Sequence, residues 1–132
     1  MGRWSKFGNT RTEYLGISFQ SKLEASVYQL LKLREAAKEI EITQIQGKVL
    51  LSEAAVEYRP DFKILDIKTG QELWVEAKGH KTPEWKLKLR LYRVYGPLPL
   101  ELWEGDYKRP YFKELILPNY ARIVESYKKP GY

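Results

Sequence analysis

A short turn sequence near the middle of the chain separates two strand-like segments, and this pattern limits the fold more than any other. Residues 58–66 and 71–78 contain runs of β-branched, aromatic and alternating apolar side chains, whereas residues 68–70 read Lys-Thr-Gly. Such turn chemistry between two strand patterns predicts a β-hairpin.

Helix patterns flank the predicted hairpin on both sides. Ser21 is a suitable N-cap, and Glu24 stands three residues later, as in a capping box. Leucine and valine recur at helical spacing after it, which predicts a helix to about Lys38. A second helix is predicted over residues 83–95, with Thr82 as its cap and a proline in its first turn.

The remaining segments complete an α/β pattern. We expect a short hairpin in residues 14–20, a strand region in 40–51 that bends at Gly47, and a strand in 98–104. A short helix is predicted near 119–127. The order of elements predicts an α/β fold with a central mixed β-sheet flanked by helices, as one domain over residues 1–132. Within it we expect a basic N-terminal arm, 1–13, and a C-terminal extension, 105–132.

Composition restricts the chemistry. The chain has no cysteine and one histidine, His80, which excludes disulfides and the common zinc sites. A bound metal would therefore be held by oxygen atoms, which favours Mg²⁺ or Mn²⁺. The net charge of +6 suits a polyanionic partner. We expect no membrane span, a cytoplasmic location and, because Lys, Glu and Tyr are plentiful, a thermostable protein.

Two carboxylates should meet on the predicted hairpin. Asp61 and Glu76 lie almost symmetrically about the turn, so the fold would bring their carboxyl groups together. Glu76 and Lys78 are two residues apart on one strand and therefore share a face. Two carboxylates and a lysine beside a hard cation suit phosphodiester hydrolysis, because the cation offsets the phosphate charge and activates water. The safer role for Lys78 is electrostatic stabilisation.

These residues carry a family resemblance. Arg59-Pro60-Asp61 followed by Val75-Glu76-Ala77-Lys78-Gly79 resembles the PD-(D/E)xK motif of restriction-type nucleases. The segments 19–25 and 82–96 resemble, in the same order, those of small phage-encoded nucleases related to Holliday-junction resolvases. The resemblance spans residues 14–104. It implies a restriction-endonuclease-like core and a homodimeric, Mg²⁺-dependent DNA endonuclease that cuts four-way junctions, with no small-molecule substrate. If the protein is phage-encoded, its location would be the host cytoplasm.

The resemblance also implies residue roles. Glu24, Asp61 and Glu76 occupy the positions of metal ligands, the carbonyl of Ala77 that of a further ligand, and Lys78 that of the catalytic lysine. From the pattern alone, Glu24 is more simply a helix-capping residue, and the two roles compete for one carboxylate. His80 matches no position of the family and is expected to lie in a loop near the site.

Basic side chains are candidates for phosphate contacts. On the second helix, Lys86, Arg90 and Arg93 fall on one face, although such a charged face is commonly only a solvated one. Trp85 lies on the opposite face and is expected in the core. The full set of predicted DNA-binding residues is Arg3, Lys6, Arg11, Lys22, Lys81, Lys86, Lys88, Arg90 and Arg93.

Two alternatives to the resolvase function remain open. The first is another nuclease with the same motif, of the restriction, repair or transposon-end type, because the active-site residues do not separate these. The second is a DNA-binding module without catalysis. The complete set of Asp61, Glu76 and Lys78 argues against the second, since a decayed site should have lost one of the three.

Overall fold

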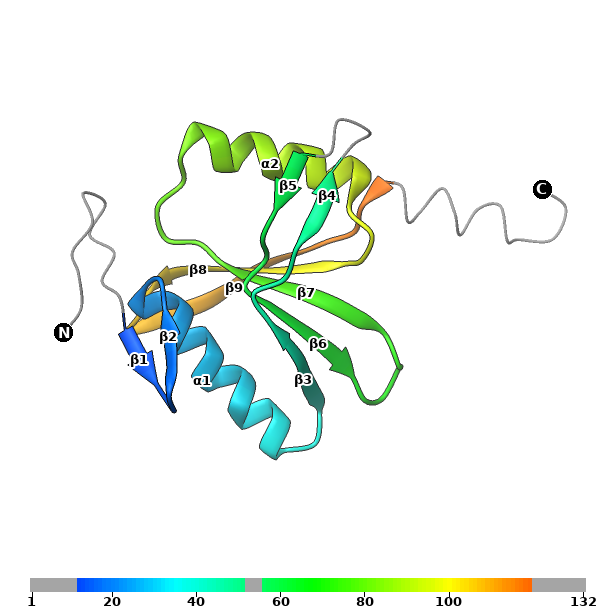
Figure 1. The fold of residues 1–132 in the computed structure, drawn as a ribbon. Coiled ribbons are helices and arrows are strands. Elements are labelled where there is room, and N and C mark those ends of the chain that lie inside the picture. The colour runs from blue at the N-terminus through cyan, green and yellow to red at the C-terminus, as the bar shows by residue number, and fades with distance from the viewer. Residues whose placement is uncertain (1–11, 52–55, 120–132) are drawn as a thin grey trace, which may run out of the picture.

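A five-stranded mixed sheet runs through the centre of the computed structural model, which describes residues 12–51 and 56–119 (Figure 1). The strand order is β3-β6-β7-β8-β9. β7 and β8 are parallel, and all other neighbours in this sheet are antiparallel. The strands are β3 Ile40–Ile45, β6 Phe62–Asp66, β7 Glu72–Ala77, β8 Leu100–Asp106 and β9 Arg109–Ile116. The predicted α/β class with a central mixed sheet is confirmed.

β6 and β7 form the predicted hairpin. Their register pairs Phe62 with Val75, and one further step would bring Asp61 opposite Glu76. The turn uses Gly70 at a φ of +74°, a conformation that glycine adopts without steric cost. The hairpin therefore brings the two predicted carboxylates to the same end, away from the turn.

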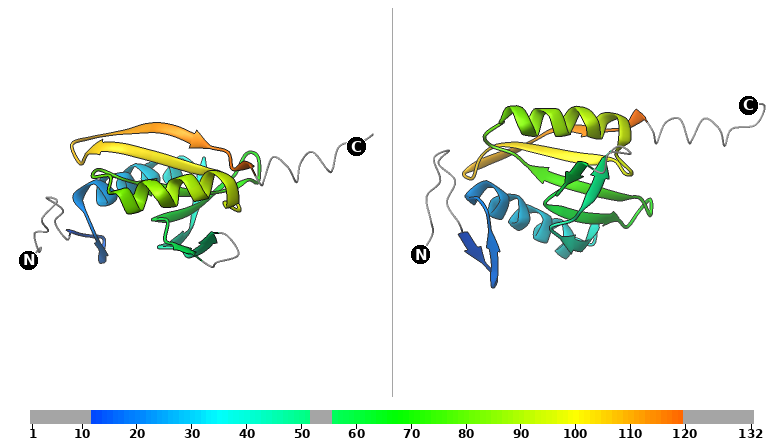
Figure 2. Two further views of the ribbon diagram at one scale, coloured as in Figure 1. Left: turned by 90° about the horizontal axis from the view of Figure 1, so that it is seen from above. Right: turned by 45° about the horizontal axis from the view of Figure 1, so that its top comes forward.

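The two helices cover opposite faces of the sheet (Figure 2). α1 spans Lys22–Ala36, and the Ser21 hydroxyl accepts a hydrogen bond from the Glu24 amide at 3.1 Å, as predicted for the N-cap. α2 spans Pro83–Tyr95 and is capped in the same way by Thr82. No helix within residues 12–51 and 56–119 is both long and apolar enough to span a membrane.

Each helix packs against one face of the sheet and covers a separate apolar core. α1 packs on one face of the sheet together with the hairpin of β1 Thr12–Tyr14 and β2 Ile17–Phe19. The short hairpin predicted for residues 14–20 is confirmed, but it begins at Thr12, so residues 12–13 belong to it and not to the predicted arm. α2 packs on the other face against Trp74, Leu100 and Leu102. Along β7, Val75 and Ala77 face the α1 core while Trp74 faces the α2 core, so the predicted alternation of β7 is confirmed.

Two predicted strands are each divided in the structure. The region 40–51 forms β3 and β4, Val49–Leu51, with the expected bend at Gly47. Tyr58 does not belong to β6 but to β5, Val56–Tyr58, which pairs with β4 in a separate ribbon. The break follows from Pro60, which has no N–H to donate to a sheet.

The strand β9 was not predicted. Residues 105–116 belong to the sheet, as the end of β8 and all of β9, so an extension cannot begin at residue 105. The charged and tyrosine side chains of this segment do not form a pattern that predicts a strand. The reason is that β9 is an edge strand, and most of its side chains are exposed. The short helix predicted for 119–127 lies, beyond Asn119, outside the described residues, and so do residues 1–11 of the predicted arm.

Gly47 provides a test of this packing. A Cβ atom at this position would lie 2.2 Å from the ring of Trp74, which is only 5% exposed, so a side chain there would displace the indole. We expect Gly47→Ala to lower the free energy of unfolding by about 1–3 kcal/mol, measured by chemical denaturation.

Gly79→Ala is the matched control. A Cβ at Gly79 would make only ordinary contacts, at 3.6 Å from Leu23 and 3.7 Å from the Gly105 carbonyl. This variant should unfold close to the parent. Equal stability of the two variants would contradict the close contact between Gly47 and Trp74.

Candidate active site

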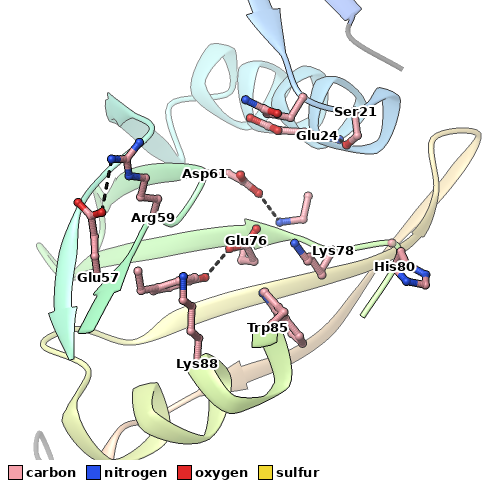
Figure 3. A pocket seen from close by; sticks show the side chains of 14 residues that line it. Ser21, Glu24, Glu57, Arg59, Asp61, Glu76, Lys78, His80, Trp85 and Lys88 are labelled. Atoms are coloured by element: carbon pink, nitrogen blue, oxygen red, sulfur yellow. Dashed lines mark hydrogen bonds and ion pairs between the residues drawn. The ribbon is translucent and has the colours of Figure 1, made fainter. Parts of the chain in front are cut away.

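The open end of the β6–β7 hairpin borders a cavity of about 350 Å³ (Figure 3). α1 contributes one wall, α2 and β5 contribute the other, and the hairpin lies between them. The cavity contains every residue predicted for catalysis or metal binding. Its lining consists of Gln20, Ser21, Glu24, Glu57, Tyr58, Arg59, Asp61, Glu76, Ala77, Lys78, Gly79, His80, Trp85 and Lys88.

Asp61 is fixed through both its backbone and its side chain. Its amide donates to the Val75 carbonyl at 3.1 Å, and its own carbonyl accepts from the Gln46 amide at 2.6 Å. Its Oδ2 accepts a hydrogen bond from the Ala77 amide at 2.8 Å. These contacts place the carboxyl group between β7 and α1, as Figure 3 shows, without dependence on a flexible loop.

Glu76 points into the same cavity from β7 and is 5% exposed. Its Oε1 accepts a hydrogen bond of 2.5 Å from the hydroxyl of Tyr58, which is itself buried. Burial, followed by the neighbouring Glu76 charge, raises the pKa of Tyr58 well above its usual value, so this hydroxyl stays a donor at neutral pH. Tyr58 therefore holds one oxygen of Glu76 in place.

The carboxyl groups of Asp61 and Glu76 interact directly. Burial, followed by the charge and hydrogen bond of Glu76, raises the pKa of Asp61 well above its usual value. Burial also raises the pKa of Glu76, although hydrogen bonds and the charge of Lys78 oppose the rise. Burial and mutual repulsion therefore oppose ionisation of this pair, whereas the nearby charge of Lys78 favours it.

Glu24 faces this pair from the first turn of α1. Burial, followed by the charge of Asp61, raises its pKa from 4.5 to about 8. A hydrogen bond from the backbone of Gln20 opposes the rise. The oxygen Oε1 is buried and has no hydrogen-bond partner among the described residues. Glu24 thus bonds the backbone of Gln20 and keeps an unpartnered oxygen, and its role in metal binding stays a prediction.

Lys78 extends from the end of β7 into the cavity. Its amide donates to the Trp103 carbonyl at 2.9 Å, which fixes the backbone at the point where β7 ends. Its positive charge lowers the pKa of Glu24, Asp61 and Glu76. Its ammonium group lies 5.8 Å from the centre of the Trp85 ring, a cation–π distance. The predicted trio of Asp61, Glu76 and Lys78 is thus assembled in one place.

The donor set fits a hard cation such as Mg²⁺. Three carboxyl groups with raised pKa values share the cavity, and Glu24 has an unpartnered oxygen in it. Among the described residues, no group of three or more Asp, Glu or His side chains is arranged so that it could hold a metal ion. Mg²⁺ does not require one, because it is usually held by one or two carboxylates and completes its shell with waters and phosphate oxygens.

Of the six predicted DNA-binding residues that the structure describes, only one lines the cavity. Lys88 does so from α2, where it also forms an ion pair with Glu84 at 3.4 Å. Lys81 is bound to the buried Glu104 at 2.6 Å, and Arg93 is paired with Glu114. Lys22 lies 4.9 Å from the ring centre of Tyr107. Lys86 and Arg90 are exposed on α2, and Arg3, Lys6 and Arg11 lie outside the described residues.

Three cavity residues were not singled out from the sequence. Tyr58 and Glu57 reach the cavity only because β5 leaves the main sheet, which no local pattern indicates. Trp85 was expected in the core, and it is 6% exposed, but it also lines the cavity. A signal for Trp85 was present, since Lys88 follows it by one helical turn and interrupts the apolar stripe of α2. His80 lies beside the cavity, as expected.

Comparisons with known proteins place the chain in a family. No match was found among curated proteins. The solved structure described as "Crystal structure of SSO0001" is similar at a TM-score of 0.40 and 16% sequence identity, over 75% of this chain and 54% of that chain. This chain thus spans about half the length of that one. The model of the family described as "Protein of unknown function (DUF1064)" matches residues 4–104, so the chain belongs to the DUF1064 family.

Proposed function

We propose that the protein is a divalent-metal-dependent endonuclease that hydrolyses phosphodiester bonds in DNA. The observation that carries this proposal is the buried carboxyl pair of Asp61 and Glu76, with Lys78 and Glu24 in the same cavity. Buried, mutually repelling carboxyl groups destabilise a fold unless they serve a charged partner. A divalent cation is a charged partner that would offset the repulsion within this carboxyl pair.

Each residue has a role that follows from its position. Asp61 and Glu76 would hold the cation, with the Ala77 carbonyl and the unpartnered oxygen of Glu24 as further ligands. When bound, such an ion supplies positive charge opposite the phosphate and makes water a better nucleophile. Tyr58 orients Glu76, and the Ala77 amide orients Asp61, so the carboxyl oxygens need no rearrangement during the reaction.

Lys78 lines the cavity, where a bound phosphate would lie. Its stem is anchored by the backbone bond to Trp103, and its ammonium group approaches the ring of Trp85. A positive charge at this place stabilises the negative charge that develops on phosphate oxygens during hydrolysis. The charge of Lys78 lowers the pKa of Glu24, Asp61 and Glu76, so its electrostatic influence on the site supports an electrostatic role better than that of a general base.

The preferred substrate within this class is branched DNA. The resemblance of residues 14–104 to phage-type resolvases supports a Holliday-junction resolvase that acts as a homodimer. The site residues alone serve equally well in a restriction, repair or transposon-end nuclease, which is the second candidate. Junction cutting would depend on DNA shape and phosphate contacts, and therefore little on base sequence.

A synthetic four-way junction tests the substrate. With Mg²⁺ or Mn²⁺ we expect the junction to be cut faster than a linear duplex of matched sequence, and with EDTA neither should be cut. Gel analysis of end-labelled strands measures both rates. Equal cutting of junction and duplex would remove the resolvase assignment and leave the nuclease one, whereas no cutting of any DNA would remove both.

The substitution Asp61→Asn tests the site. Asparagine keeps an oxygen for the Ala77 amide but removes the negative charge, so we expect folding to persist and the cleavage rate to fall at least about 100-fold. Asp66→Asn is the control, because Asp66 stands at the other end of β6 and bonds the turn through Thr69. A variant at Asp61 that cuts as fast as the parent would refute catalysis by this site.

Glu24 makes stability depend on pH and on the cation. A carboxyl group with a raised pKa binds more protons folded than unfolded between about pH 4.5 and about pH 8, so stability falls as pH rises through this window. In EDTA, Glu24→Gln should flatten that decline and be more stable than the parent at pH 8. Mg²⁺ should increase the stability of the parent protein most at high pH, because binding of the ion releases protons from the carboxyl groups.

Glu41→Gln is the control for this measurement. Glu41 is exposed on β3, away from the cavity, and its substitution should leave the pH profile parallel to that of the parent. Denaturant midpoints across pH 5–9, with and without Mg²⁺, give the comparison. A parent whose stability in EDTA does not decline toward high pH would contradict a buried, proton-binding Glu24.

A further inference from the structure

One side chain of the cavity carries a hydrogen-bond donor that the mechanism above does not use. The indole Nε1 of Trp85 is buried and has no acceptor among the described residues, although the side chain as a whole is only 6% exposed. In Figure 3 this nitrogen lies on the edge of the indole that points toward Glu76 and Lys78, into the cavity. An unpaired buried donor destabilises a fold, so its orientation toward a binding site is informative.

The protein groups nearest to Trp85 leave it without a partner for chemical reasons. An indole N–H can only donate, so it cannot pair with the ammonium groups of Lys78 or Lys88. Among the described residues no acceptor of the cavity bonds this N–H: Tyr58 bonds Glu76, the Ala77 amide bonds Asp61, and Glu24 Oε1 is itself unpartnered. An oxygen of a ligand that enters the cavity would supply the missing acceptor.

The surroundings of Trp85 select an anionic oxygen as that acceptor. Lys78 stands 5.8 Å from the ring centre, and Lys88 lies one helical turn further along α2 on the same cavity wall. The ammonium groups of Lys78 and Lys88 and the indole N–H thus line one part of the cavity, next to Glu76, whereas the carboxyl groups of Glu24 and Asp61 lie toward α1. A phosphate would bind beside the basic groups, and a cation would bind among the carboxyl groups.

We infer that Trp85 is a substrate-binding residue whose indole N–H donates to a non-bridging oxygen of the DNA phosphate. This inference rests on the proposed nuclease function and assigns a contact within that site. The indole adds a donor without adding charge, so its contribution does not change with pH. The ring also supports Lys78 through its face, so Trp85 would orient one phosphate ligand and supply another.

Trp85→Phe tests the contact, because phenylalanine keeps an aromatic face for Lys78 and removes the N–H. We expect kcat/KM to fall roughly tenfold, as for the loss of one hydrogen bond to a charged group. Trp74→Phe is the matched control. Trp74 is also buried with an unpartnered Nε1, but it lies outside the cavity, so its substitution should leave kcat/KM within about twofold of the parent. Denaturation curves establish that both variants fold.

A phosphorothioate substrate separates this contact from a purely structural effect. Sulfur in place of the bonded oxygen is a poor acceptor, so one of the two diastereomers should be cut more slowly by the parent. Trp85→Phe should lose most of that additional penalty, and Trp74→Phe should keep it. Unchanged cleavage by Trp85→Phe, or an undiminished sulfur penalty in it, would overturn the inference while leaving the nuclease proposal intact.

A binding measurement tests the contact between Trp85 and the phosphate independently of DNA cleavage. The indole N–H resonance of Trp85, assigned by its absence in Trp85→Phe, is followed while a short oligothymidylate is added with Ca²⁺ in place of Mg²⁺. A downfield shift that saturates, with no such shift for Trp74, supports the phosphate contact without any cleavage. An unmoved Trp85 resonance at saturating DNA overturns it.

Discussion

The contact between the carboxyl groups of Asp61 and Glu76 is the interaction on which the site depends. Both groups are withdrawn from solvent at the end of the β6–β7 hairpin, where burial and mutual repulsion oppose their ionisation. The surrounding bonds hold them there in spite of this. The Ala77 amide binds one carboxyl group, the Tyr58 hydroxyl binds the other, and the charge of Lys78 favours the ionised form of both. The fold thus stabilises an arrangement that is unfavourable by itself, as functional sites commonly do.

Three elements must meet for this arrangement to form, and each belongs to a different layer. α1 brings Glu24 from one face of the sheet, α2 brings Trp85 from the other, and the hairpin supplies Asp61 between them. The two apolar cores therefore determine the geometry of the cavity, since a shift of either helix on the sheet would separate its wall from the carboxyl pair. Stability and function are coupled through the packing of the helices.

Local patterns predicted the hairpin, its register and both helix caps. Asp61 opposite Glu76 follows from strand periodicity and turn position, and Ser21 and Thr82 act as expected from their side chains. The β4–β5 ribbon, β9 and the cavity role of Trp85 were not predicted. Their places depend on pairings between distant segments, and a half-exposed edge strand or a buried tryptophan has the same local signature whether or not it borders a site.

The balance of charge in the cavity implies an order of binding. The cavity is lined by four carboxyl side chains, those of Glu24, Glu57, Asp61 and Glu76. It is also lined by three basic side chains, those of Arg59, Lys78 and Lys88. A phosphate that entered this lining with the carboxyl groups ionised would be repelled. Protonation relieves the repulsion but removes the ligands that a cation requires. A divalent cation relieves it and keeps the carboxylates ionised, so under the proposed function the metal would bind first and the DNA phosphate second.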